Sequence, residues 1–214
     1  MKHKKLHEFE MEINELNKQE EQLKKDKDNA ARRKSLASTQ HERNHAEVEG
    51  KDSEVIIAGF ATQEKTADRG IQVVKDKKFN RFSVERERIR SDRNAVWLKV
   101  HHDLIEPLPS QIIQALTSEE MELDFIDILL SEKSEAYKEM NATDMEIDLF
   151  NRLALDNKMP GNVFIPVTEK LLGQYENEVR KVSTIIIRRF EASIKKINTA
   201  FEARATARAK AARR

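Results

Sequence analysis

The sequence predicts an all-α protein, an elongated set of helices that ends in a long amphipathic C-terminal helix and that assembles into an oligomer. Three observations support this fold class. Only five Gly and four Pro occur in 214 residues, so turns are few. Hydrophobic residues make up 38% and charged residues 36% of the chain, a composition that suits helices burying one stripe each. The apolar residues near the C-terminus recur with a helical period.

The Gly and Pro residues predict three linkers because they interrupt helical hydrogen bonding or admit unusual dihedral angles. The linker residues are Gly50, Gly59 and Gly70, then Pro107 and Pro109, then Pro160, Gly161 and Pro166. Four stretches without Gly or Pro are the predicted helices: 1–49, 71–106, 110–159 and 174–214. We therefore predict a charged N-terminal helix at 1–50, a central helical region at 51–159, and a C-terminal region at 160–214 with the long helix and a basic tail.

The first stretch begins with a short heptad pattern. Its apolar residues are Leu6, Phe9, Ile13, Leu16 and Leu23. Glu20 occupies the intervening position, and Lys27 and Ala30 follow, so the apolar pattern does not continue. Residues 17–49 are almost wholly charged or small, which predicts a solvated helix or a partly disordered segment.

The central region contains one ambiguous apolar run and one long stripe. Residues 55–60 are apolar over too short a length to separate a strand from a buried helix, and we favour the helix. The stripe consists of Ile71, Val74, Phe82, Ile89, Val96, Val100 and Leu104, widened by Trp97 and Leu98. Residues 75–99 carry nine Lys or Arg against four Asp or Glu, so the polar side of this helix is basic.

Two further helices are predicted from capping boxes, in which a Thr and a Glu three residues later satisfy backbone N–H groups at a helix start. Thr117 precedes Glu120, and Thr143 precedes Glu146, with this spacing. Residues 117–160 hold twelve acidic and four basic side chains, so this region is strongly acidic.

The C-terminal stripe is the clearest pattern and supplies the candidate partner-binding face. It comprises Leu172, Tyr175, Val179, Val182, Ile186, Phe190, Ile194, Ile197 and Phe201. Steps of three and four give a mean period of about 3.6, which is that of a straight helix, with Thr168 as its predicted cap. The basic tail that follows contains Arg204, Arg208, Lys210, Arg213 and Arg214.

Enzyme motifs are absent or carry little weight. His41-Glu42-Arg43-Asn44-His45 has the H-E-x-x-H spacing of zinc hydrolases, but its surroundings are among the most hydrophilic in the chain, which favours a solvated helix face. His101 and His102 are adjacent and diverge on a helix, so a shared metal is not expected. We expect no catalytic residues, no metal and no cofactor. Without Cys or an apolar membrane-length run, the sequence predicts a soluble, cytoplasmic protein.

The basic tail leaves three interpretations open. It could neutralise phosphates in sequence-independent nucleic-acid binding, or dock on an acidic protein surface such as the acidic region of another copy. It could also be a frayed, solvated end. Because the tail after Phe201 has no aromatic residue, base stacking on single strands is disfavoured.

A central segment resembles the external capsid scaffolds, or size-determination proteins, of satellite phages. The resemblance rests on residues 82–90 (FSVERERIR), 101–105 (HHDLI) and 114–116 (QAL). It implies a helical, highly charged protein that laces the outside of a helper phage's procapsid in the host cytoplasm.

We therefore expect a structural assembly protein that binds other copies of itself, as a dimer or higher oligomer, and a protein such as a capsid protein, through helix–helix contacts. The alternative is a nucleic-acid-binding or transcription-regulating protein that uses residues 75–99 and the basic tail. No membrane partner is expected.

Overall fold

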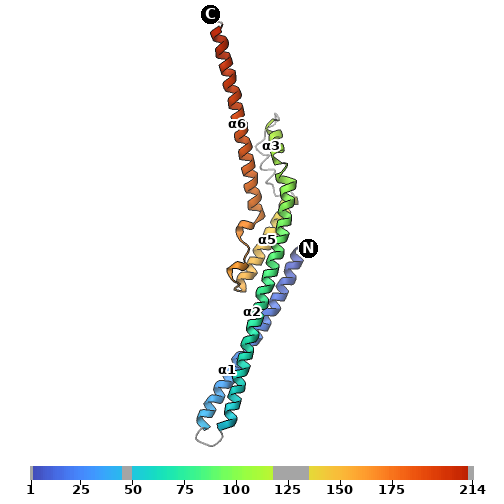
Figure 1. The fold of residues 1–214 in the computed structure, drawn as a ribbon. Coiled ribbons are helices and arrows are strands. Elements are labelled where there is room, and N and C mark those ends of the chain that lie inside the picture. The colour runs from blue at the N-terminus through green and yellow to red at the C-terminus, as the bar shows by residue number, and fades with distance from the viewer. Residues whose placement is uncertain (1, 45–49, 118–134, 212–214) are drawn as a thin grey trace. The chain divides into compact units, whose positions relative to one another are not determined.

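The computed structural model describes residues 2–44, 50–117 and 135–211, and the regular elements in these ranges are all helices (Figure 1). In chain order they are α1 (Lys2–Asn44), α2 (Gly50–Val100), the π-helix η1 (His101–Ile105), α3 (Leu108–Thr117), α5 (Glu135–Asp156), the short 3-10 helices η2 (Gly161–Val163) and η3 (Val167–Glu169), and α6 (Leu171–Ala211). The all-α prediction is confirmed for these residues. The chain divides into two compact units, Met1–Arg88 with Leu149–Phe164 and Ile89–Asp148 with Ile165–Arg214, which are described separately.

The first unit is built on an antiparallel pair formed by α1 and the first part of α2. Three ion pairs set its direction, because the partner number on α2 falls as the number on α1 rises. Glu20 pairs with Lys78, Lys27 with Asp68, and Lys34 with Glu64. Glu20, Lys27 and Lys34 occupy heptad positions where apolar residues would be expected. Each of them instead faces an opposite charge on α2, so the heptad contact between the two helices continues through ion pairs. Of the two alternatives for this segment, the solvated helix is confirmed for residues 17–44, which are helical and mostly exposed, and ion pairs as far as Lys34 also join it to α2.

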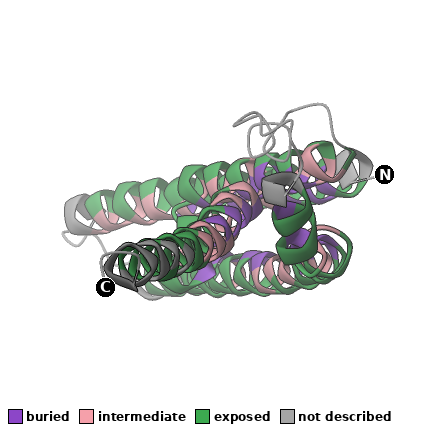
Figure 2. Cartoon of the chain, turned by 90° about the horizontal axis from the view of Figure 1, so that it is seen from above, coloured by how far each residue is buried: buried purple, intermediate pink, exposed green. Residues whose placement is uncertain are grey.

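Three phenylalanines form the centre of the first unit. Phe9 of α1, Phe82 of α2 and Phe150 of α5 are all buried, with ring centroids 5.0 to 6.1 Å apart. The Phe9 and Phe82 rings meet edge to face, the geometry that the ring quadrupoles favour. Buried residues follow stripes along the helices, and the other described residues are intermediate or exposed (Figure 2). This cluster joins α5 to the α1–α2 pair.

The second unit has a continuous apolar core that includes the start of α6. Its buried members are Val96, Val100, Ile105, Leu108, Ile112, Met140, Leu171, Tyr175 and Val179. Partly buried residues packed against them include Trp97, Leu104, Val182 and Ile186. The long stripe predicted for 71–104 is confirmed, except that Leu98 is 69% exposed and does not widen it.

The N-terminus of α6 is capped from another helix. Both carboxylate oxygens of Asp144, on α5, accept hydrogen bonds from backbone N–H groups, at 2.7 Å from Leu171 and 3.1 Å from Leu172. These are the donors that a helix start leaves without an intrahelical partner. Burial raises the pKa of Asp144, and the two N–H donors and Lys170 oppose that rise. The predicted cap, Thr168, lies instead in η3, ahead of the helix.

Replacing Asp144 by alanine is expected to lower the free energy of unfolding by about 2 kcal/mol, because two N–H groups at a helix start lose a charged acceptor. Urea denaturation followed by circular dichroism measures the change. Asp148→Ala is the matched control, since Asp148 pairs with Lys170 on the surface and its loss costs under about 1 kcal/mol. Equal losses in the two variants would contradict the capping role.

The first predicted linker is wrong, because Gly50, Gly59 and Gly70 all lie in α2. Isolated glycines cost a helix about 1 kcal/mol each relative to alanine, which pairing with a second helix can outweigh. At Gly70 the partner helix approaches closely, since an added Cβ would lie 3.1 Å from a methyl carbon of Leu23. The third linker is confirmed, with Pro160, Gly161 and Pro166 between α5 and α6. At the second linker, Pro109 is instead in the first turn of α3.

The capping box at Thr143 is also wrong. Thr143 lies inside α5 and is fully buried, and its hydroxyl donates to the carbonyl oxygen of Glu139 at 2.8 Å. A Thr bonded back to the preceding turn cannot accept a bond from the following turn as a cap does. Thr117 ends α3, and the residues after it, including Glu120, lie outside the described residues. The helix favoured for residues 55–60 is confirmed within α2.

Candidate functional site

The candidate partner-binding face on α6 divides into a covered part and an uncovered part. Tyr175 and Val179 are buried in the core of the second unit, and Leu172, Val182 and Ile186 pack against that core. Tyr175 and Val179 are therefore covered by their own chain, and the other three side chains are partly covered. Phe190 is half-buried and Ile194 is 44% exposed, so the apolar face continues beyond the point where the core ends.

The remaining predicted residues lie at the end of α6. The helix contains Ile197, Phe201, Arg204, Arg208 and Lys210, whose side chains are outside the description. Arg213 and Arg214 lie outside the described residues. The partner-binding role of this segment stays a prediction.

The described part of α6 beyond the core is basic. Arg188, Arg189, Lys195 and Lys196 are exposed, and Glu191 is the acidic residue among them. Within the described residues, none of these four cationic groups has a hydrogen-bond or ion-pair partner. Their positive charge is therefore available to a binding partner.

The basic segment 75–99 differs, because much of its charge is used inside the chain. Most of its pairs are with carboxylates: Lys78 with Glu20, Arg81 with Glu12, Arg88 with Glu85, Arg90 with Glu169, and Lys99 with Glu139. Arg93 donates to the backbone carbonyl oxygen of Glu169 at 2.8 Å and to the side chain of Gln174. Of the two basic segments that could meet nucleic acid, this one offers less free charge.

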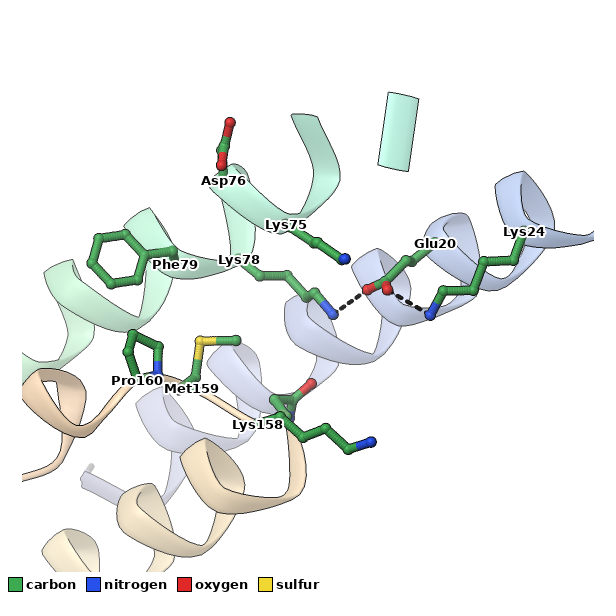
Figure 3. A pocket seen from close by; sticks show the side chains of 10 residues that line it. Glu20, Lys24, Lys75, Asp76, Lys78, Phe79, Lys158, Met159 and Pro160 are labelled. Atoms are coloured by element: carbon green, nitrogen blue, oxygen red, sulfur yellow. Dashed lines mark hydrogen bonds and ion pairs between the residues drawn. The ribbon is translucent and has the colours of Figure 1, made fainter. Parts of the chain in front are cut away.

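One pair in the first unit joins two buried charges and was missed by sequence reasoning. The Lys78 ammonium lies 2.5 Å from the Glu20 carboxylate, and both side chains are less than a tenth exposed. Lys24 donates to the other oxygen at 2.6 Å, and Asn17 accepts from Lys78 at 3.0 Å. Figure 3 shows Lys24 and Lys78 directed at the Glu20 carboxylate. The sequence does contain a signal for this pair. Glu20 and Lys78 each occupy a position that the spacing of the apolar residues on their own helix would assign to an apolar side chain.

Glu20 has a strongly perturbed pKa. Burial raises the pKa of this carboxyl group, but hydrogen bonds and attraction from Lys24 and Lys78 outweigh burial and lower it from 4.5 to about 2. The group is therefore ionised at neutral pH and cannot serve as a general acid. Its ion pair with Lys78 joins α1 to α2.

A hollow of about 570 Å³ opens beside this pair. We call it the lysine pocket, and its lining comprises Glu20, Lys24, Lys75, Asp76, Lys78, Phe79, Asn157, Lys158, Met159 and Pro160. These residues come from α1, α2 and the turn after α5 (Figure 3). Four ammonium groups against two carboxylates make the pocket cationic.

The histidine motifs are placed only in part. His41 is half-buried on α1, whereas His45 lies outside the described residues, so the H-E-x-x-H spacing is not tested. The Nδ1 atoms of His101 and His102 lie 3.5 and 3.0 Å from the Glu106 carboxylate. Among the residues that the structure describes, no group of three or more acidic or histidine side chains could hold a metal ion.

Comparisons with protein-family models, with curated proteins and with solved structures find no match to this chain. Within the described ranges, no helix combines the length and the apolarity needed to cross a membrane.

Proposed function

We propose that the chain is a structural assembly protein whose copies associate through α6 beyond Ile186. The observation that carries this proposal is that the apolar face of α6 continues past the core that covers its first part. Phe190 and Ile194 extend the same face that Tyr175 and Val179 begin. Covering this extension removes apolar surface from water and favours association.

The charge around this face indicates how a second copy binds. Residues 188–196 expose four cationic side chains beside one Glu, so two such segments repel each other at close range. Residues 117–160 carry an excess of acidic side chains and include an apolar component. A basic face on one copy that binds the acidic region of another satisfies both the apolar and the charge requirement.

The test is the molar mass of the full chain, measured by light scattering during size exclusion. The wild-type chain is expected to be at least a dimer, and Phe190→Asp with Ile194→Asp is expected to be monomeric, because an interface cannot bury two unpaired carboxylates. These positions are preferred to Ile186, since Ile186 packs on the chain's own core and its loss would also destabilise the fold.

The matched control carries the same two added charges at exposed apolar sites elsewhere, Leu98→Asp with Leu155→Asp. Its mass is expected to equal that of the wild type. A monomeric wild-type chain would contradict the self-association proposal. If the variant with both α6 substitutions remained a dimer, the interface would lie on another surface and the role of α6 would be wrong.

Binding to a capsid protein rests on the resemblance of residues 82–90, 101–105 and 114–116, and it is part of the same proposal. Phe82, Glu85 and Ile89 are buried, so any contact made by this segment would use its other side chains. Co-sedimentation of the chain with assembled capsids of a candidate host tests that contact.

Nucleic-acid binding is the second candidate, favoured by the unpaired cations of residues 188–196. Such binding would be independent of sequence and would weaken steeply as salt rises. A filter-binding titration of generic DNA and RNA measures it. Absence of binding at low salt would remove this candidate, and truncation after Phe201 would separate the tail's share from that of residues 188–196.

A further inference from the structure

The lysine pocket has more positive charge than its own acidic residues neutralise. The Glu20 carboxylate is already occupied by Lys78 and Lys24, at 2.5 and 2.6 Å. The Asp76 side chain accepts a bond from Gln72 on its own helix at 2.9 Å and points away from the Glu20 pair in Figure 3. Within the described residues, the ammonium groups of Lys75 and Lys158 have no hydrogen-bond or ion-pair partner. The lining therefore keeps a net positive charge, because its two carboxylates balance only two of its four lysines.

The backbone of Lys158 is unusual. Its φ of 54° is in the left-handed region, and it is the one described non-glycine residue with a positive φ. Lys158 lies in the turn that follows the end of α5 at Asp156, where the N–H of Met159 bonds to the carbonyl oxygen of Ala154 at 2.9 Å. Glycine is the residue that this helix-ending position favours, because it has no Cβ to strain. A lysine here costs stability, so its side chain is a candidate for a function.

One wall of the pocket is apolar. Phe79 is 37% exposed on α2, and Met159 and Pro160 line the pocket from the turn after α5. The volume of about 570 Å³ is within the range of small-molecule sites. Figure 3 shows the ammonium groups of Lys75 and Lys158 on the opposite side of the pocket from Phe79, an arrangement that fits an elongated ligand with an anionic part at one end and a flat apolar part at the other.

We propose that the lysine pocket binds a phosphorylated small molecule with a flat apolar group, in the class of nucleoside polyphosphates. Lys75 and Lys158 contact the phosphate oxygens, which supply several acceptors and more than one charge. Phe79 contacts the flat group. Glu20 keeps Lys78 and Lys24 in place and makes no contact with the ligand. The site lies entirely in the first unit and is independent of the α6 face.

The experiment is isothermal titration calorimetry of the full chain with ATP in the absence of divalent metal. Inorganic tripolyphosphate and adenosine are parallel probes of the charged part and the flat part. Binding of ATP is expected to weaken as salt rises. Tripolyphosphate is expected to bind more weakly than ATP, and adenosine more weakly still. No heat from ATP or tripolyphosphate at low salt would overturn the proposal.

Two variants test the named lysines. Lys75→Ser and Lys158→Gly are each expected to weaken ATP binding about three- to tenfold. Lys158→Gly is also expected to raise the melting temperature, because glycine relieves the left-handed backbone. A gain in stability together with a loss of affinity separates a binding role from a structural one.

Lys77→Ser is the matched control, since Lys77 is an exposed lysine on the same helix and does not line the pocket. Its affinity for ATP is expected to equal that of the wild type. If Lys77→Ser and Lys75→Ser weaken binding equally, the binding is diffuse attraction to a basic surface and the proposed site is wrong.

Phe79→Ala is expected to remove the preference for ATP over tripolyphosphate. An unchanged preference would exclude the contact between Phe79 and the flat group.

Discussion

Replacing Phe82 by alanine is expected to lower the free energy of unfolding by about 3–5 kcal/mol. Phe82 is fully buried, and its ring centroid lies 5.0 Å from that of Phe9 and 5.8 Å from that of Phe150. The substitution removes the ring that contacts both α1 and α5, so it loses apolar burial and leaves a cavity between three helices. Urea denaturation followed by circular dichroism measures the loss.

Phe79→Ala is the matched control for Phe82. Phe79 lies nearly one turn earlier on the same helix, but its side chain is 37% exposed, and its loss is expected to cost about 1 kcal/mol or less. Similar losses in the two variants would show that the three-ring cluster is not the centre of the first unit. If the Phe79→Ala variant keeps its fold, a change in its ATP binding can be attributed to the lost ring contact and not to unfolding.

The buried pair of Glu20 and Lys78 is the basis of the second large effect. Lys78→Met is expected to lower the free energy of unfolding by about 3 kcal/mol, because it leaves the buried Glu20 carboxylate with Lys24 as its remaining cation. Replacing both residues, Glu20→Leu with Lys78→Met, is expected to restore the stability to within about 1 kcal/mol of wild type or above it. Chemical denaturation of the two single variants and the double variant gives the coupling energy directly.

The same pair predicts how stability depends on pH. Because the pKa of Glu20 is lowered from 4.5 to about 2 on folding, its contribution is present above pH 4.5 and is lost as pH falls toward 2. The contribution is roughly 1–3 kcal/mol, the upper value corresponding to the whole shift in pKa. Melting temperatures measured across this range should fall less for the double variant than for wild type. Parallel curves would contradict the assignment to Glu20.

The pair of Glu20 and Lys78 also favours the register in which α1 and α2 are paired. An acid and a base at apolar heptad positions are costly unless they face each other, so a shift along the helices would leave both buried and unpaired. Lys27 with Asp68 and Lys34 with Glu64 repeat the match along α1. We expect the double apolar variant, if stable, to show weaker discrimination between registers. Cysteine cross-linking between α1 and α2 measures that discrimination.

Local pattern was sufficient for the all-α class, for α6 and for much of the central stripe. Apolar spacing near 3.6 residues is a property of neighbouring positions, so α6 and the stripe from Ile71 to Val100 could be predicted without knowing their partners. The same reasoning failed where a local signal was overridden by contacts. Gly59 and Gly70 predicted a linker, but both lie inside α2. Thr143 has the spacing of a capping box, but it lies inside α5 and starts no helix.

Of the two candidate sites, one was predicted from local sequence pattern and the other was not. The apolar face on α6 could be found from the sequence, but how much of it is already covered could not, since Val96, Ile112 and Met140 are remote in sequence from Val179. The lysine pocket was missed for the same reason. Its lining combines residues of α1 and α2 with the turn at Lys158, and its unusual backbone angle appears only in the folded chain.

By itself the sequence determined that the described part of this chain is helical and that the chain is rich in charge, and it predicted an apolar face on the last helix, because each of these is set by residues within a few turns of one another. Only the tertiary structure decided which charges are neutralised, that Asp144 caps α6, and which α6 side chains pack on the core of the second unit. Those outcomes depend on pairs such as Glu20 with Lys78, whose attraction is strong only after folding removes the surrounding water.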